Sequence, residues 1–121
     1  MNRSVQFGLF QPQLGLSFAE LKERAQACEE LGFHSIWFTD HMWARGLPRV
    51  DFLEGWTLMS SIALSTTTLR VGGLVLCNSY RNPAFLAKMV ASLDNISGGR
   101  VEIGLGAGWM DEEYRAYGYP F

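Results

Sequence analysis

The sequence predicts an α/β protein built on a parallel sheet. Four strand-like segments begin near residues 5, 34, 69 and 101, and a helix-like segment separates each from the next. This spacing fits repeated units of strand, crossover helix and parallel strand. The second strand-like segment, residues 35–39, is a continuous β-branched and aromatic run, which is typical of a parallel strand covered on both faces.

The first unit combines a short strand with a capped helix. Residues 5–10 are rich in β-forming side chains and are followed at once by a Gln-Pro pair, which ends a strand because proline lacks the N–H. Ser17 and Glu20 have the spacing of a capping box, and Gly32 supplies a stop signal. We therefore expect a helix over about residues 17–31.

The second unit contains the longest connection of the chain. Residues 42–53 carry Trp43, Gly46 and Pro48 and exceed the length that a connection from strand to helix needs. Loops of this kind usually have a use. Residues 54–65 then show one apolar side and are predicted to form a helix.

The third unit has a strand with an internal glycine pair and a sharply bounded helix. Gly72 and Gly73 invite a bulge within the strand predicted at 69–76. Asn82 can cap a helix and Pro83 suits its first position. The predicted buried stripe of this helix consists of Phe85, Leu86, Met89, Val90, Leu93 and Ile96.

The last strand alternates apolar residues with glycines. Val101, Ile103, Leu105 and Ala107 are expected to fill one face, and the glycines at 104, 106 and 108 leave the other face as bare backbone. Such a face predicts the close approach of a flat ligand or of another element. Another helix is expected to begin after residue 110.

Composition points to a globular protein of one domain, residues 1–121, with 48% hydrophobic residues. A net charge of -2 without a basic cluster argues against nucleic acid and membrane surfaces as partners. Met1–Ser4 lead into a strand instead of a signal-peptide core, so we expect a cytoplasmic protein. Cys28 and Cys77 lack the spacing of a zinc site and are expected to be reduced thiols; no metal site is predicted.

Two architectures fit four βα units. One is an open doubly wound sheet, and the other is half of an eight-stranded (β/α) barrel, which typically needs about 250 residues. A dinucleotide-binding Rossmann fingerprint is weak here, because Trp109 stands where the third glycine would be.

Candidate site residues gather where the strands end. Ligands of parallel sheets bind at the carboxyl ends of strands, where Asp40 and His41, Cys77 and Asn78, and residues 106–109 all fall. Asp40 could instead be a cap, and His41 a loop imidazole, although an imidazole there could also move a proton. Aromatic rings at 43 and 109 could form a ligand wall or simply pack. Arg81 fits a surface residue and is left out of the predicted site.

Several motifs together resemble the luciferase-like oxidoreductases that use flavin or deazaflavin. They are ELGF at 30–33, TDH at 39–41, RNPAFLAK at 81–88, SLDNISGGRVEIGLGAGW at 92–109 and EEYRAYG at 112–118. The resemblance runs through the whole chain and implies the first four βα units of a TIM barrel. It is greatest for the branch that uses coenzyme F420, with the FMN-dependent monooxygenases next.

The resemblance implies roles for individual residues. Asp40 would help to place the cofactor, His41 would serve catalysis, and a non-proline cis peptide at Leu74–Val75 would bulge against the cofactor ring. Together with the reasoning from strand ends, it gives His41 as the catalytic residue and Trp43 as a substrate-pocket residue. The predicted cofactor-binding residues are Asp40, Leu74, Val75, Cys77, Asn78, Gly106, Gly108 and Trp109.

Two departures from the family pattern shape the functional expectation. Trp109 replaces the acidic proton donor of the sugar-phosphate dehydrogenases, so that activity is disfavoured. Strands five to eight are also missing, so we expect either a fragment of a longer protein or a half-barrel that is completed by a partner. That partner would be a second copy in a homo-oligomer or a complementary C-terminal half-barrel. The expected function is hydride transfer between F420 and a small organic substrate. The alternatives are FMN-dependent monooxygenation with O₂ and a non-catalytic half-barrel assembly module or fragment.

Overall fold

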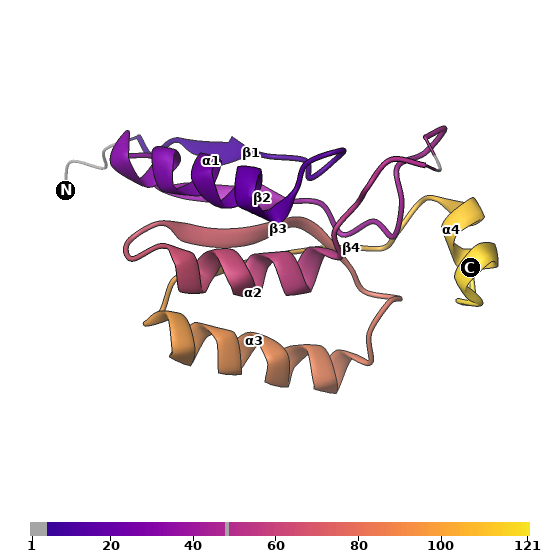
Figure 1. Ribbon diagram of the computed structural model, residues 1–121. Helices are drawn as coiled ribbons and strands as arrows, with labels where there is room; N and C mark the ends of the chain where they lie inside the picture. The colour runs from indigo at the N-terminus through magenta and orange to yellow at the C-terminus, as the bar shows by residue number, and fades with distance from the viewer. Residues whose placement is uncertain (1–4, 48) are drawn as a thin grey trace.

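The computed structural model of the chain describes residues 5–47 and 49–121 (Figure 1). Met1–Ser4 and Pro48, which entered the expectations about targeting and about the long loop, lie outside these residues. The elements are β1 (Gly8–Phe10), α1 (Phe18–Glu30), β2 (Ser35–Phe38), α2 (Gly55–Ser65), β3 (Arg70–Cys77), α3 (Pro83–Ser97), β4 (Val101–Gly106) and α4 (Asp111–Tyr117).

The four strands form one parallel sheet in the order β1-β2-β3-β4. α1, α2 and α3 lie on the same face of the sheet (Figure 1). One apolar core joins them to it and includes Ile36, Phe38 and Val71 of the strands. A doubly wound sheet would reverse its strand order and carry helices on both faces. The half-barrel architecture is therefore confirmed, and the open doubly wound sheet is excluded.

Helix boundaries follow the capping signals closely. Ser17 and Glu20 form both hydrogen bonds of the capping box of α1. The Asn82 side chain accepts from the amides at the start of α3, Pro83 stands in its first turn, and Gly98 ends it in the left-handed conformation. These contacts satisfy backbone groups that the helix itself cannot pair.

The segment before β1 and the apolar stripe of α3 are more exposed than expected. Residues 5–7 do not extend β1, and Phe7 is 69% exposed beside this edge strand. On α3 the core stripe is narrower than predicted: Leu86 and Leu93 are buried, whereas Phe85 and Ile96 are more than 60% exposed and flank an outer groove next to α2. Leu86 and Leu93 are seven residues, or two helical turns, apart, so α3 contacts the core along one narrow stripe.

β4 also departs from expectation on its apolar face. Ile103 is 37% and Leu105 60% exposed. These side chains do not fill a buried face, because β4 is an edge strand and α4 lies beyond the carboxyl end of the sheet instead of packing on it (Figure 1).

The face of the sheet opposite the helices is organised around Trp37. A Cβ atom on Gly72 would lie 2.6 Å from the Trp37 ring, and one on Gly8 would lie 2.9 Å from its indole nitrogen. The indole N–H donates to Ser35 Oγ at 2.8 Å. Gly72 therefore provides clearance for a ring, and the register shift of β3 lies beyond it, between Gly73 and Leu76. β2 was expected to be covered on both faces: Ile36 and Phe38 are buried under the helices, whereas Trp37 lies on the other face and is partly exposed.

Glu29 ties the end of α1 to the turn before β3. Its Oε1 accepts from the amides of Thr67 and Leu69 at 2.8 and 2.9 Å, and from the amide and hydroxyl of Thr68. Burial disfavours the charged carboxylate, but these hydrogen bonds outweigh burial and lower the pKa of Glu29 from 4.5 to about 2.

We expect Glu29→Gln to flatten the pH dependence of stability in acid. A carboxyl group with a lowered pKa in the folded state stabilises the fold above its unfolded pKa, and this stabilisation is lost as pH falls from 4.5 towards 2. Urea unfolding at a series of pH values measures the effect. Glu30→Gln, an exposed neighbour on the same helix, is the control and should leave the slope unchanged. Equal slopes for all three proteins would contradict this role.

No helix in the part of the chain that the structure describes is long and apolar enough to cross a membrane. Cys28 and Cys77 are both buried and free, as expected for reduced thiols.

Candidate active site at the carboxyl end of the sheet

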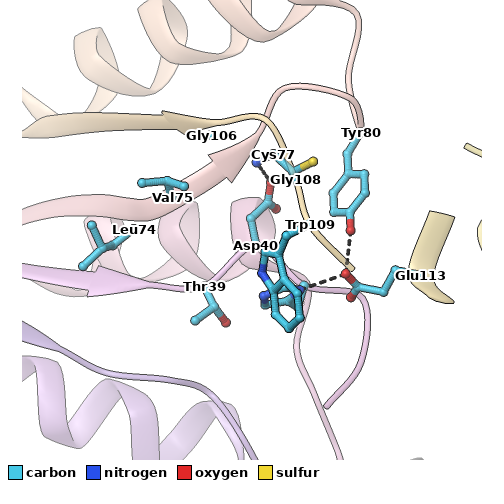
Figure 2. A pocket seen from close by; sticks show the side chains of 11 residues that line it. Thr39, Asp40, Leu74, Val75, Cys77, Tyr80, Gly106, Gly108, Trp109 and Glu113 are labelled. Carbon is cyan, nitrogen blue, oxygen red and sulfur yellow. Dashed lines mark hydrogen bonds and ion pairs between the residues drawn. The ribbon is translucent and has the colours of Figure 1, made fainter. Parts of the chain in front are cut away.

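A cavity of about 180 Å³ opens where β2, β3 and β4 end (Figure 2). Eight of the ten predicted site residues line it, which places residues from three strand ends in one cavity. The lining also includes Thr39, Tyr80 and Glu113, which were not predicted. The complete lining is Thr39, Asp40, His41, Leu74, Val75, Cys77, Tyr80, Gly106, Gly108, Trp109 and Glu113.

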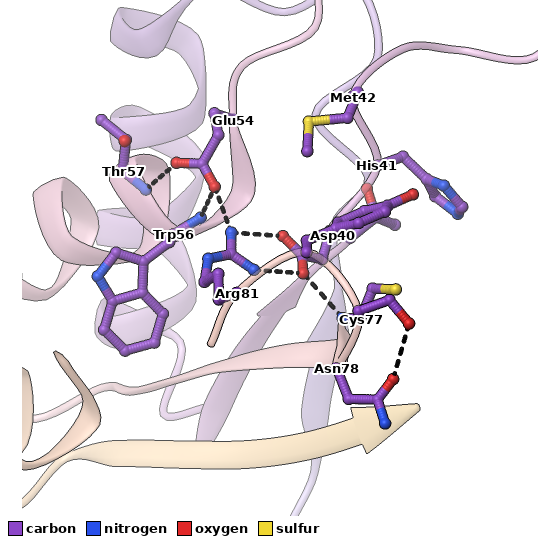
Figure 3. A network of polar contacts seen from close by, with 12 residues as sticks. Asp40, His41, Met42, Glu54, Trp56, Thr57, Cys77, Asn78 and Arg81 are labelled. Carbon is purple, nitrogen blue, oxygen red and sulfur yellow. Dashed lines mark hydrogen bonds and ion pairs between the residues drawn. The ribbon is translucent and has the colours of Figure 1, made fainter. Parts of the chain in front are cut away.

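Asp40 joins three segments at the back of the cavity (Figure 3). Its Oδ2 accepts from the Cys77 amide at 2.8 Å and from Arg81 Nη1 at 2.7 Å, and its Oδ1 accepts from Arg81 Nη2 at 2.9 Å. The Asp40 side chain is 3% exposed. Its carboxylate thus connects the end of β2 to the end of β3 and to the segment before α3 by hydrogen bonds. Contact between Asp40 and a cofactor stays a prediction.

Arg81 is a second member of this network and not the surface residue expected from sequence. Its side chain is 12% exposed and also pairs with Glu54, whose carboxylate caps α2 by accepting from the amides of Trp56 and Thr57 at 2.9 and 2.7 Å. Burial opposes the charge of Arg81, but the hydrogen bonds and charges of Asp40 and Glu54 outweigh it and raise the pKa of Arg81. The prediction failed because an arginine two residues before a helix carries no sequence signal of its buried partners.

Glu113 is the centre of a second buried network. Its side chain is 0% exposed, accepts from three groups and lies within hydrogen-bond distance of the His41 ring. His41 Nδ1 lies 2.8 Å and the Tyr80 hydroxyl 2.6 Å from Oε2, while the amides of Met42 and Trp43 lie 2.6 and 3.4 Å from Oε1. Burial, and next the hydrogen bond to Glu113, raise the pKa of Tyr80. The network connects α4 to the loop after β2.

Tyr114 fixes the thiol that faces the cavity. Its hydroxyl lies 3.1 Å from Cys77 Sγ and donates to the Ala107 carbonyl at 3.1 Å. Burial, followed by the contact with Cys77, raises the pKa of Tyr114. Gly108, with φ of 85°, passes so close that a Cβ there would lie 1.9 Å from the Tyr114 hydroxyl.

The peptide bond between Leu74 and Val75 is cis, at the position expected from the family resemblance. Both side chains are partly exposed, at 48% and 42%, and line the cavity. A Cβ on Gly104 would lie 2.9 Å, and one on Gly106 2.5 Å, from a Val75 methyl group. The glycine face of β4 is thus occupied by the neighbouring strand, which is one of the two alternatives that the alternation left open. Gly106 and Gly108 nevertheless line the cavity, and their contact with a cofactor stays a prediction.

Three aromatic or polar residues complete the account of the predicted site. Trp109 is 59% exposed and meets the His41 ring edge-on, with ring centroids 5.6 Å apart at 82°. Trp43 does not line the cavity: its ring packs edge-on against Tyr117, and its Nε1 is buried without a hydrogen-bond partner among the described residues. Asn78 lies outside the lining as well, and its backbone N–H donates to the Gly106 carbonyl at 3.0 Å. Ligand contacts of Trp43 and Asn78 stay predictions.

Known proteins share both the sequence pattern and the fold. The sequence model of the family described as luciferase-like monooxygenase matches residues 5–121. A 5,10-methylenetetrahydromethanopterin reductase of Archaeoglobus fulgidus is 30% identical over 105 residues, which are 86% of this chain and 29% of that protein. The chain therefore spans under a third of the length of this relative.

Two solved structures superpose on most of the chain. An F420-dependent secondary alcohol dehydrogenase in complex with an F420-acetone adduct gives a TM-score of 0.85 with 26% identity, over 96% of this chain and 36% of that one. The oxygenating constituent of 3,6-diketocamphane monooxygenase from Pseudomonas putida, in complex with FMN, gives 0.79 with 23% identity, over 96% and 33%. The second likeness shows the fold.

Proposed function

Because the chain belongs to the luciferase-like monooxygenase family, we propose that it forms part of an oxidoreductase that transfers hydride between coenzyme F420 and a small organic substrate. The observation that carries the proposal is the cavity at the strand ends, which combines an apolar wall with an imidazole. Relatives matched in sequence and in structure include F420-dependent enzymes, which supports F420 as the cofactor.

The residues present fit a flat, partly apolar cofactor. Leu74 and Val75 offer a half-exposed apolar surface, and Gly106, which packs against Val75, also lines the cavity. Ligand sites are usually lined by apolar groups with a few convergent polar ones. Here His41 is a polar lining residue whose Nε2 has no hydrogen-bond partner in the described part of the chain. F420, when bound, supplies a hydride carrier. Leu74, Val75 and Gly106 would hold its ring, while His41 would hold or move a proton at Nε2.

This chain supplies only part of the ligand site. A volume of about 180 Å³ is below the roughly 300–1,000 Å³ of ordinary ligand pockets. Within residues 5–47 and 49–121, no helix covers the sheet face around Trp37, and β1 and β4 are both edge strands. We infer that a complementary half-barrel or a second copy of the chain provides the remaining wall, because open edges and uncovered apolar faces favour association.

Monooxygenation with FMN is the second candidate. It is favoured by the FMN-bound monooxygenase that shares the fold, and the same apolar wall suits either ring system. Within the cavity, no described residue distinguishes the two cofactors, so a direct comparison of binding is needed.

We expect the protein to bind F420 more tightly than FMN, as measured by the fluorescence change of each cofactor on titration. Val75→Glu should weaken F420 binding by about tenfold or more, which corresponds to about 1.4 kcal/mol, because it places a charge on the apolar wall. Leu31→Glu is the matched control, since Leu31 is 76% exposed at the far end of α1.

The possible outcomes separate the candidates. Tighter binding of FMN would favour the monooxygenase. Binding of neither cofactor by a sample with native circular dichroism would contradict an enzymatic role for this chain alone and would favour the assembly module.

A further inference from the structure

We propose that Glu113 is a positioning residue that holds the neutral ring of His41 in the Nδ1–H tautomer and so leaves Nε2 as its acceptor atom. The assignment of the tautomer depends on the contacts of Glu113 and His41. Its meaning for catalysis rests on the proposed function.

The contacts of Glu113 favour its ionised form. The amides of Met42 and Trp43 can only donate, and both point at Oε1. Oε2 lies between the Tyr80 hydroxyl at 2.6 Å and His41 Nδ1 at 2.8 Å. An ionised carboxylate is a pure acceptor and satisfies all four contacts at once. A carboxyl proton on either oxygen would compete with groups already placed to donate, so the geometry favours the ionised form.

An ionised Glu113 determines which nitrogen of His41 carries the proton. Because an ionised Glu113 can only accept, the ring nitrogen that faces it must carry hydrogen. In a neutral imidazole only one nitrogen is protonated, and the partner of one nitrogen therefore decides the state of the other. Contact with Glu113 places the proton on Nδ1 and leaves a lone pair on Nε2.

The lone pair on His41 Nε2 is available to a ligand in the cavity. His41 lines the cavity, and its side chain keeps 27% exposure. Nε2 has no hydrogen-bond partner among the residues that the structure describes, while the edge-on contact with Trp109 restricts the ring on one side. Nε2 is thus the ring atom left for a ligand. The ligand group that meets the neutral ring is a hydrogen-bond donor, such as a hydroxyl group.

The substitution Glu113→Gln tests this assignment, because it should reverse the tautomer. The glutamine carbonyl takes the place of Oε1, since the Met42 and Trp43 amides need an acceptor there. Its NH₂ group then replaces Oε2 and donates to His41 Nδ1, which must become the acceptor. The proton moves to Nε2. Retention of the two backbone contacts is expected to preserve the loop that a smaller side chain would release.

Nitrogen NMR of the full chain labelled with ¹⁵N-histidine reads the tautomer directly. The chain has only two histidines, so His34 serves as an internal reference. At a pH where the ring is neutral, we expect a pyrrole-type Nδ1 and a pyridine-type Nε2 for His41 in the wild type. In Glu113→Gln the two shifts should exchange, while those of His34 stay unchanged.

Two further variants separate positioning from general disturbance. Tyr80→Phe removes one donor to Oε2 and should keep the wild-type tautomer of His41. Glu112→Gln changes an adjacent carboxylate whose side chain is 58% exposed and should leave the spectrum unaltered. A pyridine-type Nδ1 in the wild type would overturn the proposal, even if Glu113→Gln failed to fold. An unchanged His41 spectrum in folded Glu113→Gln would overturn it as well. The NMR spectra are recorded without a cofactor, so a result that contradicts the tautomer assignment is distinct from a failure to bind F420.

Discussion

Arg81→Leu is expected to lower the free energy of unfolding by about 3–5 kcal/mol. The substitution removes two hydrogen bonds from Asp40, whose side chain is 3% exposed. Among the described residues, the Cys77 amide is then the one donor left to its carboxylate. An ionised group that is left buried without its partner bears the full desolvation penalty. Urea unfolding followed by circular dichroism measures the loss.

A surface ion pair on α4 provides the matched control. Arg115 pairs with Asp111 one turn away, and the Arg115 side chain is 79% exposed. Arg115→Leu should cost no more than about 0.5 kcal/mol, because water screens exposed pairs. Similar losses for the two arginine variants would show that Asp40 does not depend on Arg81.

Gly108→Ala is expected to destabilise the carboxyl end of the sheet through two separate effects. With φ of 85°, the backbone at this position costs an L-residue about 1–2 kcal/mol. The new methyl group would also lie 1.9 Å from the Tyr114 hydroxyl, and Tyr114 is 2% exposed and has no room to withdraw. Overpacking of this kind costs roughly 1–3 kcal/mol more. Thermal unfolding measures the sum.

Gly118 separates the two effects. Its φ is 72°, but a Cβ there would meet no atom within 4 Å, so Gly118→Ala should show the backbone cost alone. Removing the hydroxyl with Tyr114→Phe should recover part of the loss of Gly108→Ala, which a double-mutant cycle detects as a positive coupling. Losses of the same size for both glycine variants would refute the steric explanation.

The fold was predictable because its signals are local. The capping box at Ser17, the Asn82–Pro83 start of α3 and the repeated βα spacing all act over a few residues and are met in the structure. These local signals left open the choice between two parallel architectures, and the family resemblance predicted the half-barrel that the structure has. That choice depends on which face of the sheet each helix covers, and the covering of a face is a long-range property.

The candidate site was predictable in part for the same reason. Residues at strand ends, such as His41 and Val75, can be found by counting along the chain. Glu113 and Arg81 were missed because their importance comes from partners 72 and 41 residues away, His41 and Asp40. The motif containing Glu113 supported the family resemblance, but nothing in its spacing distinguished this carboxylate from its exposed neighbour Glu112.

The strand order has a consequence for how the protein folds. Each strand pairs with the strand that precedes it in the chain, and each crossover contains one helix, so every pairing closes a loop of similar, modest length. These pairings are non-local, and parallel sheets fold more slowly than proteins built on local contacts, but no strand has to wait for a partner that comes later in the chain than the next strand. Every new βα unit can therefore dock on a sheet edge that has already formed, so the order of synthesis is also an order in which the sheet can assemble.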